Sequence, residues 1–361
     1  MSSIYLTFSG DSACPYNRFL CPSRFCQPDF PGHKIETGPA LMPEKGWDWI
    51  GFHGIPNLQT LIELQKRRLR GMKLLWSLDD DWYSIPDWNP AKLIEDAETI
   101  REFMCGMADA VLVTEEHLSG VMLKHIRRDA PLLEAPNLVD LSEFPAKPPK
   151  FDDKGYSFMQ RLPVRVVWSG SATHREDIEQ MIRPLDTLLS RLGPDEVQVI
   201  FVGEMPPAPL LRKYLHKGVL YHPPVTFEAY RKAMESIRPD VILCPLAPVD
   251  FNRSKSNLRV IESWGMIAVP VASDFGPYTC IHDGVDGFKP KDEYEWSEVL
   301  ELICRDHQRR FAMAITGRLR CEAEYSWENP ACRRKWNETF AMLLGCPVPE
   351  SGKFTSEESR G

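Results

Sequence analysis

A lysine beside a serine, followed seven residues later by a glutamate, gives the segment 251–278 the chemistry of an anion and sugar site. We expect Ser256 or Asn257 to cap a helix that runs to about Trp264. The N–H groups of a first helical turn attract phosphate, and Lys255 adds a full positive charge. Glu262 lies about 9 Å from Ser256 along the helix axis, at a rise of 1.5 Å per residue. This separation matches the distance from the diphosphate to the ribose of one nucleotide.

The end of this helix and the strand after it complete the unit. Gly265 suits the position just after a helix, where φ is often positive. The apolar segment 267–273 predicts a short buried strand. A glutamate at the edge of a buried helix face is also common in units that bind nothing, so Glu262 alone leaves a structural role open. The whole ordered string favours a nucleotide site.

The succession of Glu262, Gly265, Pro270 and Gly276 resembles the nucleotide-sugar site of the GT-B glycosyltransferases, in their family-four-like group (glycosyl transferases group 1). In that family the matching glutamate binds the donor ribose. The usual motif has a second glutamate eight residues earlier, and this chain has Ser254 there. With Ser254 and the Lys-Ser pair after it, this chain resembles a variant subgroup of the family. In the family the earlier glutamate normally contacts the donor sugar, so the replacement affects which sugar is bound.

The resemblance implies a glycosyltransferase that uses a nucleotide-diphosphate sugar, retains the anomeric configuration and needs no essential metal or other cofactor. Lys255 and the helix N-terminus would stabilise the charge that grows on the leaving phosphate. Two alternatives stay open. One is a sugar-nucleotide epimerase or phosphorylase of the same fold, and the other is a non-catalytic protein that binds nucleotide sugar or nucleic acid.

A second segment, VVWSGSATHRED, predicts a strand, a turn of small residues and a helix start that meets the donor diphosphate. His174 either touches phosphate or sugar, or it satisfies the helix start. Main-chain groups near Val225 are expected to recognise the base. The expected donor-binding residues are Gly170, Ser171, His174, Val225, Arg253, Ser254, Lys255, Ser256, Asn257, Leu258 and Glu262.

Three adjacent aspartates follow an apolar strand in SLDDDWYSIP, which resembles a loop of the same glycosyltransferase group. Asp80 and Asp81, with Lys255, are the expected catalytic residues. A divalent-metal site and a solvated loop are the competing interpretations of the aspartates, and no metal ligand is assigned. The expected acceptor-side residues, chosen by position, are Gly10, Arg18, His53 and Asp79. For His53 a buried, hydrogen-bonded role is favoured.

Alternating strand and helix patterns predict an α/β fold with two Rossmann-like doubly wound domains that face a cleft. A C-terminal helix, with Trp327, Trp336 and Phe340 as packing residues, is expected to cross back to the first domain. The helix after Asn57 is expected to bury Leu58, Leu61, Ile62 and Leu69. The predicted strands are 4–8, 47–54, 72–78, 109–114, 131–137, 164–170, 197–203, 218–224, 239–246 and 267–273. The predicted domains are an acceptor domain at 1–145 with a returning helix at about 330–349, a donor domain at 160–329, and a flexible tail at 350–361.

The chain has 361 residues, a net charge of −8 and ten cysteines. The acidic total argues against a general polyanion binder. Basic groups at 66–73 and 124–128 are best interpreted as solvated helix faces. The alternative is an anionic acceptor: a lipid surface, a lipid-linked sugar, or a DNA base of the kind that phage enzymes modify. No stable protein partner is implied.

The start of the chain lacks a basic region followed by a long apolar run, and no apolar stretch approaches about 20 residues. A cytoplasmic location is therefore predicted, with peripheral attachment to a membrane as the alternative. The cluster Cys14, Cys21, Cys26 and His33 lacks the tight spacing of zinc pairs. Reduced, partly buried thiols are the favoured interpretation of all ten cysteines.

Overall fold

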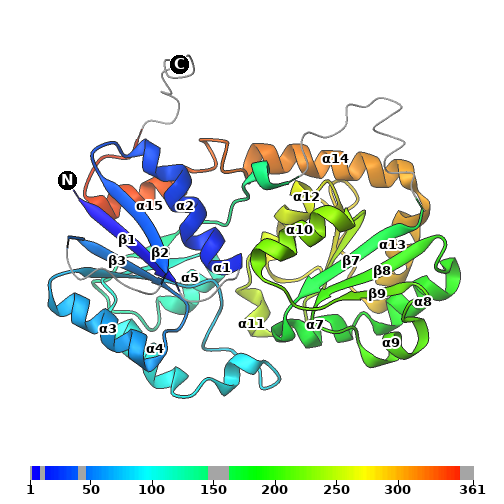
Figure 1. The fold of residues 1–361 in the computed structure, drawn as a ribbon, viewed down its shortest axis with the longest axis horizontal. Coiled ribbons are helices and arrows are strands. Elements are labelled where there is room, and N and C mark those ends of the chain that lie inside the picture. Colours follow the sequence, from blue (N-terminus) through cyan, green and yellow to red (C-terminus); the bar gives the residue numbers. More distant parts are fainter. Residues whose placement is uncertain (1, 9–12, 40–45, 145–161, 350–361) are drawn as a thin grey trace, which may run out of the picture. The chain divides into compact units, whose positions relative to one another are not determined.

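The computed structural model describes residues 2–8, 13–39, 46–144 and 162–349 (Figure 1). Gly10, the residues between the two predicted domains (146–159) and the expected tail lie outside the described residues. The contacts divide the chain into two units. The first comprises residues 1–79, 98–138 and 323–361, and the second comprises 80–97 and 139–322.

The first unit is a six-stranded, fully parallel sheet with the strand order β2-β1-β3-β4-β5-β6. Its inner strands β3, β4 and β5 are buried along almost their whole length, which explains their apolar sequences. In Figure 1, α2 and α15 lie on one side of this sheet and α3 and α4 on the other. The strands are β1 (Ser3–Phe8), β2 (Lys34–Pro39), β3 (Trp49–His53), β4 (Lys73–Ser77), β5 (Ala110–Val113) and β6 (Leu132–Glu134). The helices are α1 (Ala13–Pro15), η1 (Tyr16–Leu20), α2 (Cys21–Cys26), η2 (Gln27–Asp29), α3 (Leu58–Leu69), α4 (Ala97–Met107), α5 (Glu116–Met122) and α15 (Arg334–Leu344).

The second unit is a five-stranded, fully parallel sheet with the order β11-β10-β7-β8-β9. Pro270 lies in β11 at the edge of the sheet, where a missing N–H costs least. The strands are β7 (Val164–Gly170), β8 (Val197–Gly203), β9 (Val219–His222), β10 (Val241–Cys244) and β11 (Val269–Ala272). The helices are η3 (Pro90–Leu93), η4 (Leu141–Glu143), η5 (Ala172–His174), α7 (Arg175–Glu179), α8 (Ile182–Leu192), α9 (Ala208–Tyr214), α10 (Phe227–Ile237), α11 (Asp250–Arg253), α12 (Leu258–Gly265), η6 (Gly276–Cys280), α13 (Glu293–Arg305) and α14 (His307–Glu324).

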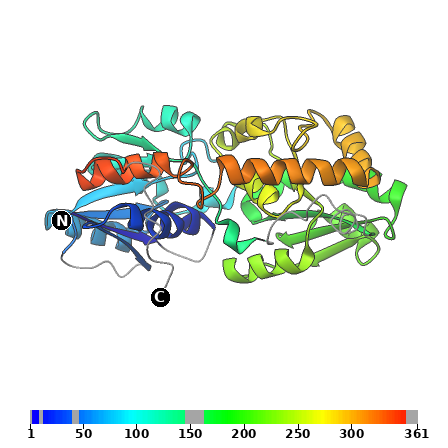
Figure 2. The same ribbon diagram turned by 90° about the horizontal axis from the view of Figure 1, so that it is seen from above.

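The C-terminal helix α15 packs on the first sheet, beside α2, β1 and β6 (Figure 2). Trp327, Trp336 and Phe340 are fully buried in that core, as the sequence predicts. The indole of Trp327 donates to the carbonyl of Leu138 at 3.0 Å, and that of Trp336 donates to Pro136 at 2.8 Å. Each burial of such a ring stabilises the unit by roughly 1.5–3 kcal/mol. These contacts attach the end of the chain to the unit that contains its beginning.

The prediction for the buried face of α3 is partly wrong. Asn57 caps the helix as expected, since its side chain accepts from the N–H of Thr60 at 2.8 Å. Of the four expected inward residues only Leu61 is buried, and its partner on that face is Leu64. The exposed residues Leu58, Ile62 and Leu69 lie on a neighbouring stripe of the helix.

The segment 80–97 follows β4 of the first sheet in sequence but packs with the second unit. Its short helix η3 contacts η5, which follows β7. Residues from two distant parts of the sequence therefore meet beside the carboxyl end of β7.

Each sheet has a topological switch point, where the strands that follow in sequence are added on opposite sides of one strand. In the first sheet β2 and β3 lie on opposite sides of β1, and in the second β8 and β10 lie on opposite sides of β7. At such positions the loops after neighbouring strands diverge and leave a crevice at the carboxyl ends, where doubly wound proteins bind ligands.

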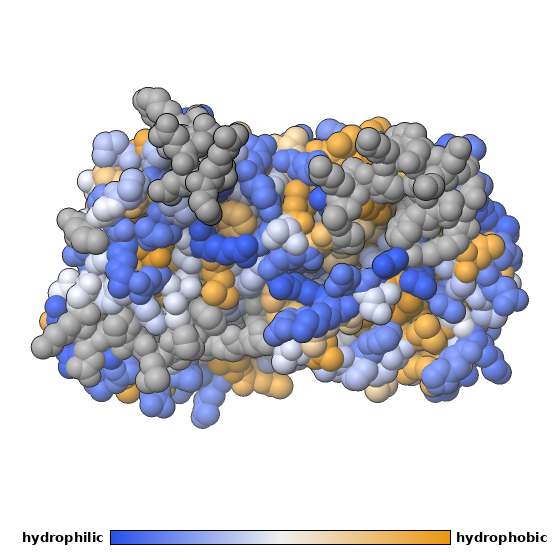
Figure 3. All heavy atoms as spheres, turned by 45° about the horizontal axis from the view of Figure 1, so that its top comes forward, coloured by the Kyte–Doolittle hydropathy of each residue, from blue (hydrophilic) through white to orange (hydrophobic). Residues whose placement is uncertain are grey.

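Within the part of the chain that the structure describes, no helix combines the length and the hydropathy needed to cross a bilayer. On the face drawn in Figure 3, hydrophobic residues lie in separate groups among hydrophilic ones.

Candidate donor site

Asp177 joins the loops after β7 and β10. It is fully buried in α7, and its Oδ1 accepts from the N–H of Ala247 at 2.7 Å and from the amide of Asn252 at 2.8 Å. Its Oδ2 lies 2.8 Å from Nδ1 of His174. A buried carboxylate with this many partners fixes both loops at the crevice of the second sheet. Asp177 could not be identified as a site residue from the sequence, because its role depends on contacts with residues about seventy positions away.

His174 is held as a neutral imidazole. Burial lowers its pKa to about 4, helped by the charges of Arg259 and Lys255, and the bond to Asp177 only partly offsets this. Since Asp177 can only accept, the neutral ring carries its proton on Nδ1, and Nε2 is left as an acceptor. His174 is thus suited to accept from a sugar hydroxyl and unsuited to bind phosphate as a cation.

Lys255 is less exposed than the sequence analysis expected. Its side chain is 14% exposed, its Nζ lies 2.7 Å from Oδ1 of Asp80, and it also lies 4.4 Å from the ring centre of Phe251. The ion pair links the segment after β4 to the loop before α12. Lys255 is therefore a positioned cation that pairs with the carboxylate of Asp80.

Glu262 is a half-buried carboxyl on α12 with unusual electrostatics. Burial raises its pKa to about 7, although Arg259 and Arg231 act in the opposite direction. Among the described residues its side chain makes no hydrogen bond or ion pair. A desolvated carboxyl without a hydrogen-bond donor is costly to the fold alone, and such groups are common at binding sites.

Arg259 is a further cation of the site that the sequence analysis missed. It lies one turn before Glu262, and its guanidinium donates to the carbonyl of Ser169 near the end of β7. Its charge acts on both Glu262 and His174. A single arginine in an amphipathic helix gives no signal in the sequence that separates it from a solvated one.

Around the N-terminus of α12, Asn257 and Ser256 accept from N–H groups of the first turn, whereas Ser254 does not. Asn257 takes the N-cap position through its backbone carbonyl, and Ser256 accepts weakly from the N–H of Leu258 at 3.4 Å. Ser254, however, is fully buried, and its hydroxyl has no partner in the described residues. Ser254 is therefore buried beneath the loop surface, although it was expected among the donor-binding residues.

Two motif glycines have different reasons for their identity. Gly276 has φ of +62°, and a Cβ there would lie 2.8 Å from the carbonyl oxygen of Asn252, so the loop after β11 requires glycine. Gly265 is the last residue of α12, and the expectation of positive φ there is wrong. The left-handed residue is Ile267, with φ of +58°. At Gly265 a side chain would instead meet the ring of Phe144, which packs against it.

The other expected donor-binding residues have contacts of their own. Gly170 ends β7, and its carbonyl accepts from Glu204 at 2.7 Å. Ser171 is exposed, and its hydroxyl is bonded to Thr173 at 2.7 Å. Arg253 lies over the ring of Phe275 and pairs with Asp250. Val225 lies in an exposed loop before α10.

The three adjacent aspartates have different partners. Asp79 lies 3.3 Å from Nε2 of His53, and Asp80 pairs with Lys255. Asp81 is 2% exposed and accepts from the N–H of Tyr83 at 2.8 Å, which forms a turn. Among the described residues the three carboxylates do not gather into one metal-binding group, and Asp81 has a structural contact.

On the acceptor side of the prediction, Arg18 is fully buried. Its guanidinium donates to the carbonyl of Ala135 at 2.6 Å and of Val113 at 3.2 Å, and it stacks on Trp336. Burial lowers its pKa to about 10. These contacts give Arg18 a structural role in place of the expected phosphate or acceptor contact. His53 is buried and bonded through Nδ1 to Ser77, as favoured from the sequence.

The sequence has no match among family models, and no curated protein matches it. Solved structures do match it in fold. HepE of Anabaena, solved with UDP and glucose, superposes with a TM-score of 0.62 at 13% identity, over 94% of this chain and 99% of HepE. Sucrose-phosphate synthase from Thermosynechococcus elongatus gives 0.65 at 14% identity, over 96% and 100% of the two chains. A glycosyltransferase from Rickettsia africae gives 0.60 at 12% identity, over 95% and 98%.

These similarities show the fold. The chain has the GT-B fold, with one parallel sheet of six strands and one of five. The predicted fold class of two doubly wound α/β units is confirmed.

Proposed function

We propose that this protein is a glycosyltransferase that takes its sugar from a nucleotide-diphosphate sugar. The observation that carries the proposal is the carboxyl of Glu262, which lies half-buried with a pKa of about 7 and without a hydrogen-bond donor in the part of the chain that the structure describes. Ribose supplies two adjacent hydroxyls, which are the donors that such a group lacks. The fold agrees, since HepE, a structural neighbour, was solved with UDP-glucose.

In this proposal the diphosphate lies at the N-terminus of α12. The N–H groups of the first turn and the ammonium of Lys255 bind its oxygens. Asp80 keeps the ammonium in place, at 2.7 Å. As the bond between the sugar and the phosphate breaks, negative charge grows on the leaving oxygen. Fixed dipoles and a positioned cation stabilise that charge without reorganisation, so the step needs no metal.

The proposed stereochemical outcome is retention of the anomeric configuration, as the resemblance to the family-four-like group implies. No protein carboxylate is assigned as a nucleophile, since Asp81 is held in a turn and Asp80 is paired. We propose that the acceptor hydroxyl attacks from the side of the leaving phosphate, which takes the acceptor proton. The anomeric configuration is then retained. The neutral Nε2 of His174 accepts from a sugar hydroxyl and orients the donor.

The test of the reaction is product analysis of the purified protein with a panel of nucleotide sugars, with and without added acceptors, followed by NMR. We expect one donor to be consumed, faster with an acceptor, and the new bond to have the donor's configuration. Conversion of the donor to an isomeric nucleotide sugar would indicate an epimerase. No consumption over long incubation, despite binding, would indicate a non-catalytic protein.

The role of Asp177 gives a separate prediction. In Asp177→Asn the amide oxygen stays with its two donors, Ala247 and Asn252, so the NH2 group faces Nδ1 of His174. That ring nitrogen then loses its acceptor, and the ring takes its other tautomer. Because a net hydrogen bond is worth about 0.5–1.5 kcal/mol, we expect the affinity for the nucleotide sugar to fall by up to roughly tenfold. The affinity for the free nucleotide diphosphate should change little. Calorimetry with both ligands measures this difference.

His174→Ala is the comparison for this variant. If Asp177 acts through His174, the double variant loses no more sugar-dependent affinity than either single variant. Equal losses for the nucleotide diphosphate and the nucleotide sugar would show that Asp177 only holds the loops.

A further inference from the structure

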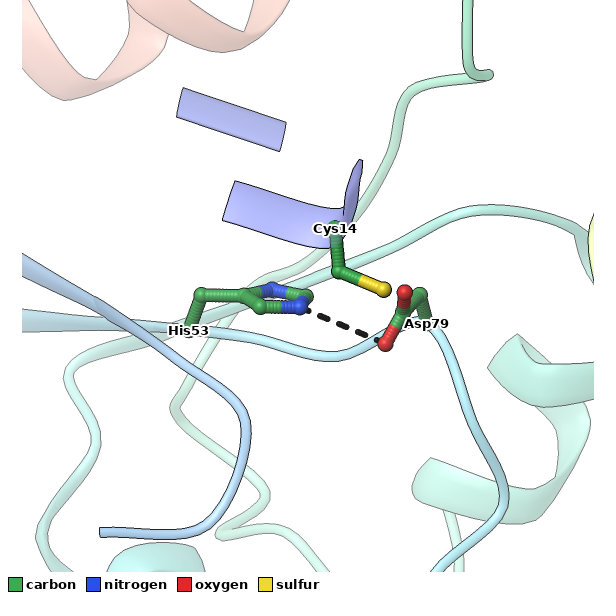
Figure 4. A group of neighbouring side chains, drawn as sticks. All are labelled: Cys14, His53 and Asp79. Atoms are coloured by element: carbon green, nitrogen blue, oxygen red, sulfur yellow. Dashed lines mark ion pairs between the residues drawn. The ribbon is translucent and has the colours of Figure 1, made fainter. Parts of the chain in front are cut away.

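A thiol, an imidazole and a carboxylate meet in the first unit. Cys14 lies in α1 after β1, His53 ends β3, and Asp79 follows β4 (Figure 4). One possible ligand atom from each lies within 4.8 Å of the others. Nε2 of His53 is 3.3 Å from Oδ1 of Asp79. These residue types are ligands for transition metals.

The place of this group in the fold is that of a ligand site. The strands β2 and β3 lie on opposite sides of β1, so the loops after β1 and β3 diverge. Cys14 lies in the connection after β1, His53 is the last residue of β3, and Asp79 lies just after the next strand, β4. The three side chains thus converge at the carboxyl edge where a doubly wound sheet opens.

The orientation of His53 fits a metal ligand. Its Nδ1 lies 3.2 Å from the hydroxyl of Ser77, and its ring contacts the edge of Phe19. These contacts fix the ring and direct Nε2 toward Asp79. Metal-binding histidines commonly have their second nitrogen bonded in this way.

A nucleophilic triad fits less well. In a Cys-His-Asp triad the carboxylate orients one ring nitrogen while the thiol meets the other. In Figure 4 the thiol of Cys14 and the carboxylate of Asp79 lie on the same side of the imidazole of His53. Their arrangement is that of groups around a common centre.

We propose that Cys14, His53 and Asp79 bind a zinc-type divalent ion with one open coordination position. Zinc ligands lie about 2.0–2.3 Å from the metal, and a tetrahedral site therefore separates its ligand atoms by about 3.3–3.7 Å. The 3.3 Å between His53 and Asp79 already matches. Sulfur and imidazole ligands favour zinc over magnesium or calcium.

The charge around the site bears on the fourth ligand. Arg18 is close enough for its charge to interact with both Cys14 and Asp79. With the thiol and the carboxyl ionised, a divalent ion and its three ligands carry no net charge, so the guanidinium of Arg18 leaves one positive charge beside the site. An anion in the open position, such as hydroxide or an acidic group of a ligand, neutralises it. The site takes no part in the proposed bond cleavage at the donor site.

The first test is titration of the reduced, tag-free, full-length protein with Co²⁺, whose bonds to thiolate absorb light. We expect one equivalent to bind and to produce the sulfur-to-cobalt charge-transfer band. Cys14→Ser should abolish the band. Cys346→Ser is the matched control, since Cys346 is also a partly buried thiol of the first unit, and it should leave the band unchanged. A band that persists in Cys14→Ser would overturn the proposal, as would no band in the wild type.

The second test uses Zn²⁺ and X-ray absorption. The spectrum should show one sulfur ligand, with nitrogen and oxygen for the rest, and two or more sulfurs would contradict the site. Asp79→Asn should weaken zinc binding by about tenfold or more, whereas Asp87→Asn, at an exposed carboxylate, should not. Circular dichroism checks that each variant is folded. Nucleotide affinity should be the same with and without zinc, which separates this proposal from the proposed function.

Discussion

Replacing Lys255 with methionine is expected to lower the turnover of the nucleotide sugar by about 10²–10³-fold, the usual cost of removing one fixed group that stabilises transition-state charge. Methionine keeps the apolar stem that lies over Phe251 while it removes the charge. The loss should fall on kcat more than on the affinity for the nucleotide sugar, because the charge on the phosphate grows as the bond breaks. Steady-state kinetics with the preferred donor measures both.

Two further variants make this result specific. Lys289→Met is the matched control, since Lys289 also lies in the second unit, is 19% exposed and pairs with Asp274. It should retain normal turnover. The double variant Lys255→Met, Asp80→Asn also removes the charge of the carboxylate that pairs with Lys255 in the wild type. Recovery of turnover in the double variant, or near-normal turnover in Lys255→Met, would remove Lys255 from the reaction.

Replacing Glu262 with glutamine is expected to have opposite effects on binding and on stability. Because hydrogen bonds to a charged group contribute about 1.5–3 kcal/mol, the affinity for the nucleotide diphosphate should fall by roughly ten- to a hundredfold. For the wild type, affinity should also fall as the pH drops below about 7, where Glu262 becomes protonated. The variant should lack this pH dependence. Calorimetry between pH 5.5 and 8.5 measures both effects.

The stability of the unliganded protein should change in the other direction. The pKa of Glu262 rises from an ordinary value of 4.5 to about 7 on folding, so the folded state binds the proton more tightly. The resulting stabilisation is complete below about pH 4.5 and is lost as the pH rises through 7. Glutamine does not titrate. The free energy of unfolding of the variant should therefore exceed that of the wild type by roughly 2–3 kcal/mol at pH 8 and equal it near pH 4.

Glu301→Gln supplies the contrast. Glu301 lies on α13 with two arginine partners, and hydrogen bonds from Arg191 and Arg305 lower its pKa. Its replacement should therefore leave stability unchanged or slightly lower at pH 8. If Glu262→Gln lowered stability at pH 8, the carboxylate would be a stabilised structural group and its assignment to the ribose would be wrong.

The strands were predictable because their sequences carry the signal themselves. Val164–Gly170 and Val197–Gly203 are continuous apolar segments bounded by glycine, and they form β7 and β8 with the predicted bounds. By contrast β2 has the sequence KIETGP, which carries little hydrophobic pattern. Its place as a strand depends on pairing with β1, which the sequence does not show.

The face of α3 shows the limit of pattern analysis. At about 100° per residue, Leu58, Ile62 and Leu69 lie on one stripe of the helix, and Leu61 and Leu64 lie on another. Both stripes are apolar, so the sequence alone could not determine which one packs on the sheet. The structure buries the second stripe and exposes the first.

The candidate site was predictable to the extent that its residues adjoin one another in sequence. Lys255 and Glu262 belong to one loop and one helix, so their spacing is visible in the sequence. Asp177 and Arg259 depend on contacts between loops: Asp177 holds Ala247, and Arg259 reaches Ser169. The pairing of Lys255 with Asp80 likewise joins residues that are far apart in sequence.

A crystal structure of the protein with its preferred nucleotide diphosphate tests the central claim most directly. The account predicts the β-phosphate at the N-terminus of α12, within hydrogen-bond distance of Nζ of Lys255. It also predicts both ribose hydroxyls on the carboxylate of Glu262. A nucleotide bound at another place, or one whose ribose faces away from Glu262, would contradict the proposed function.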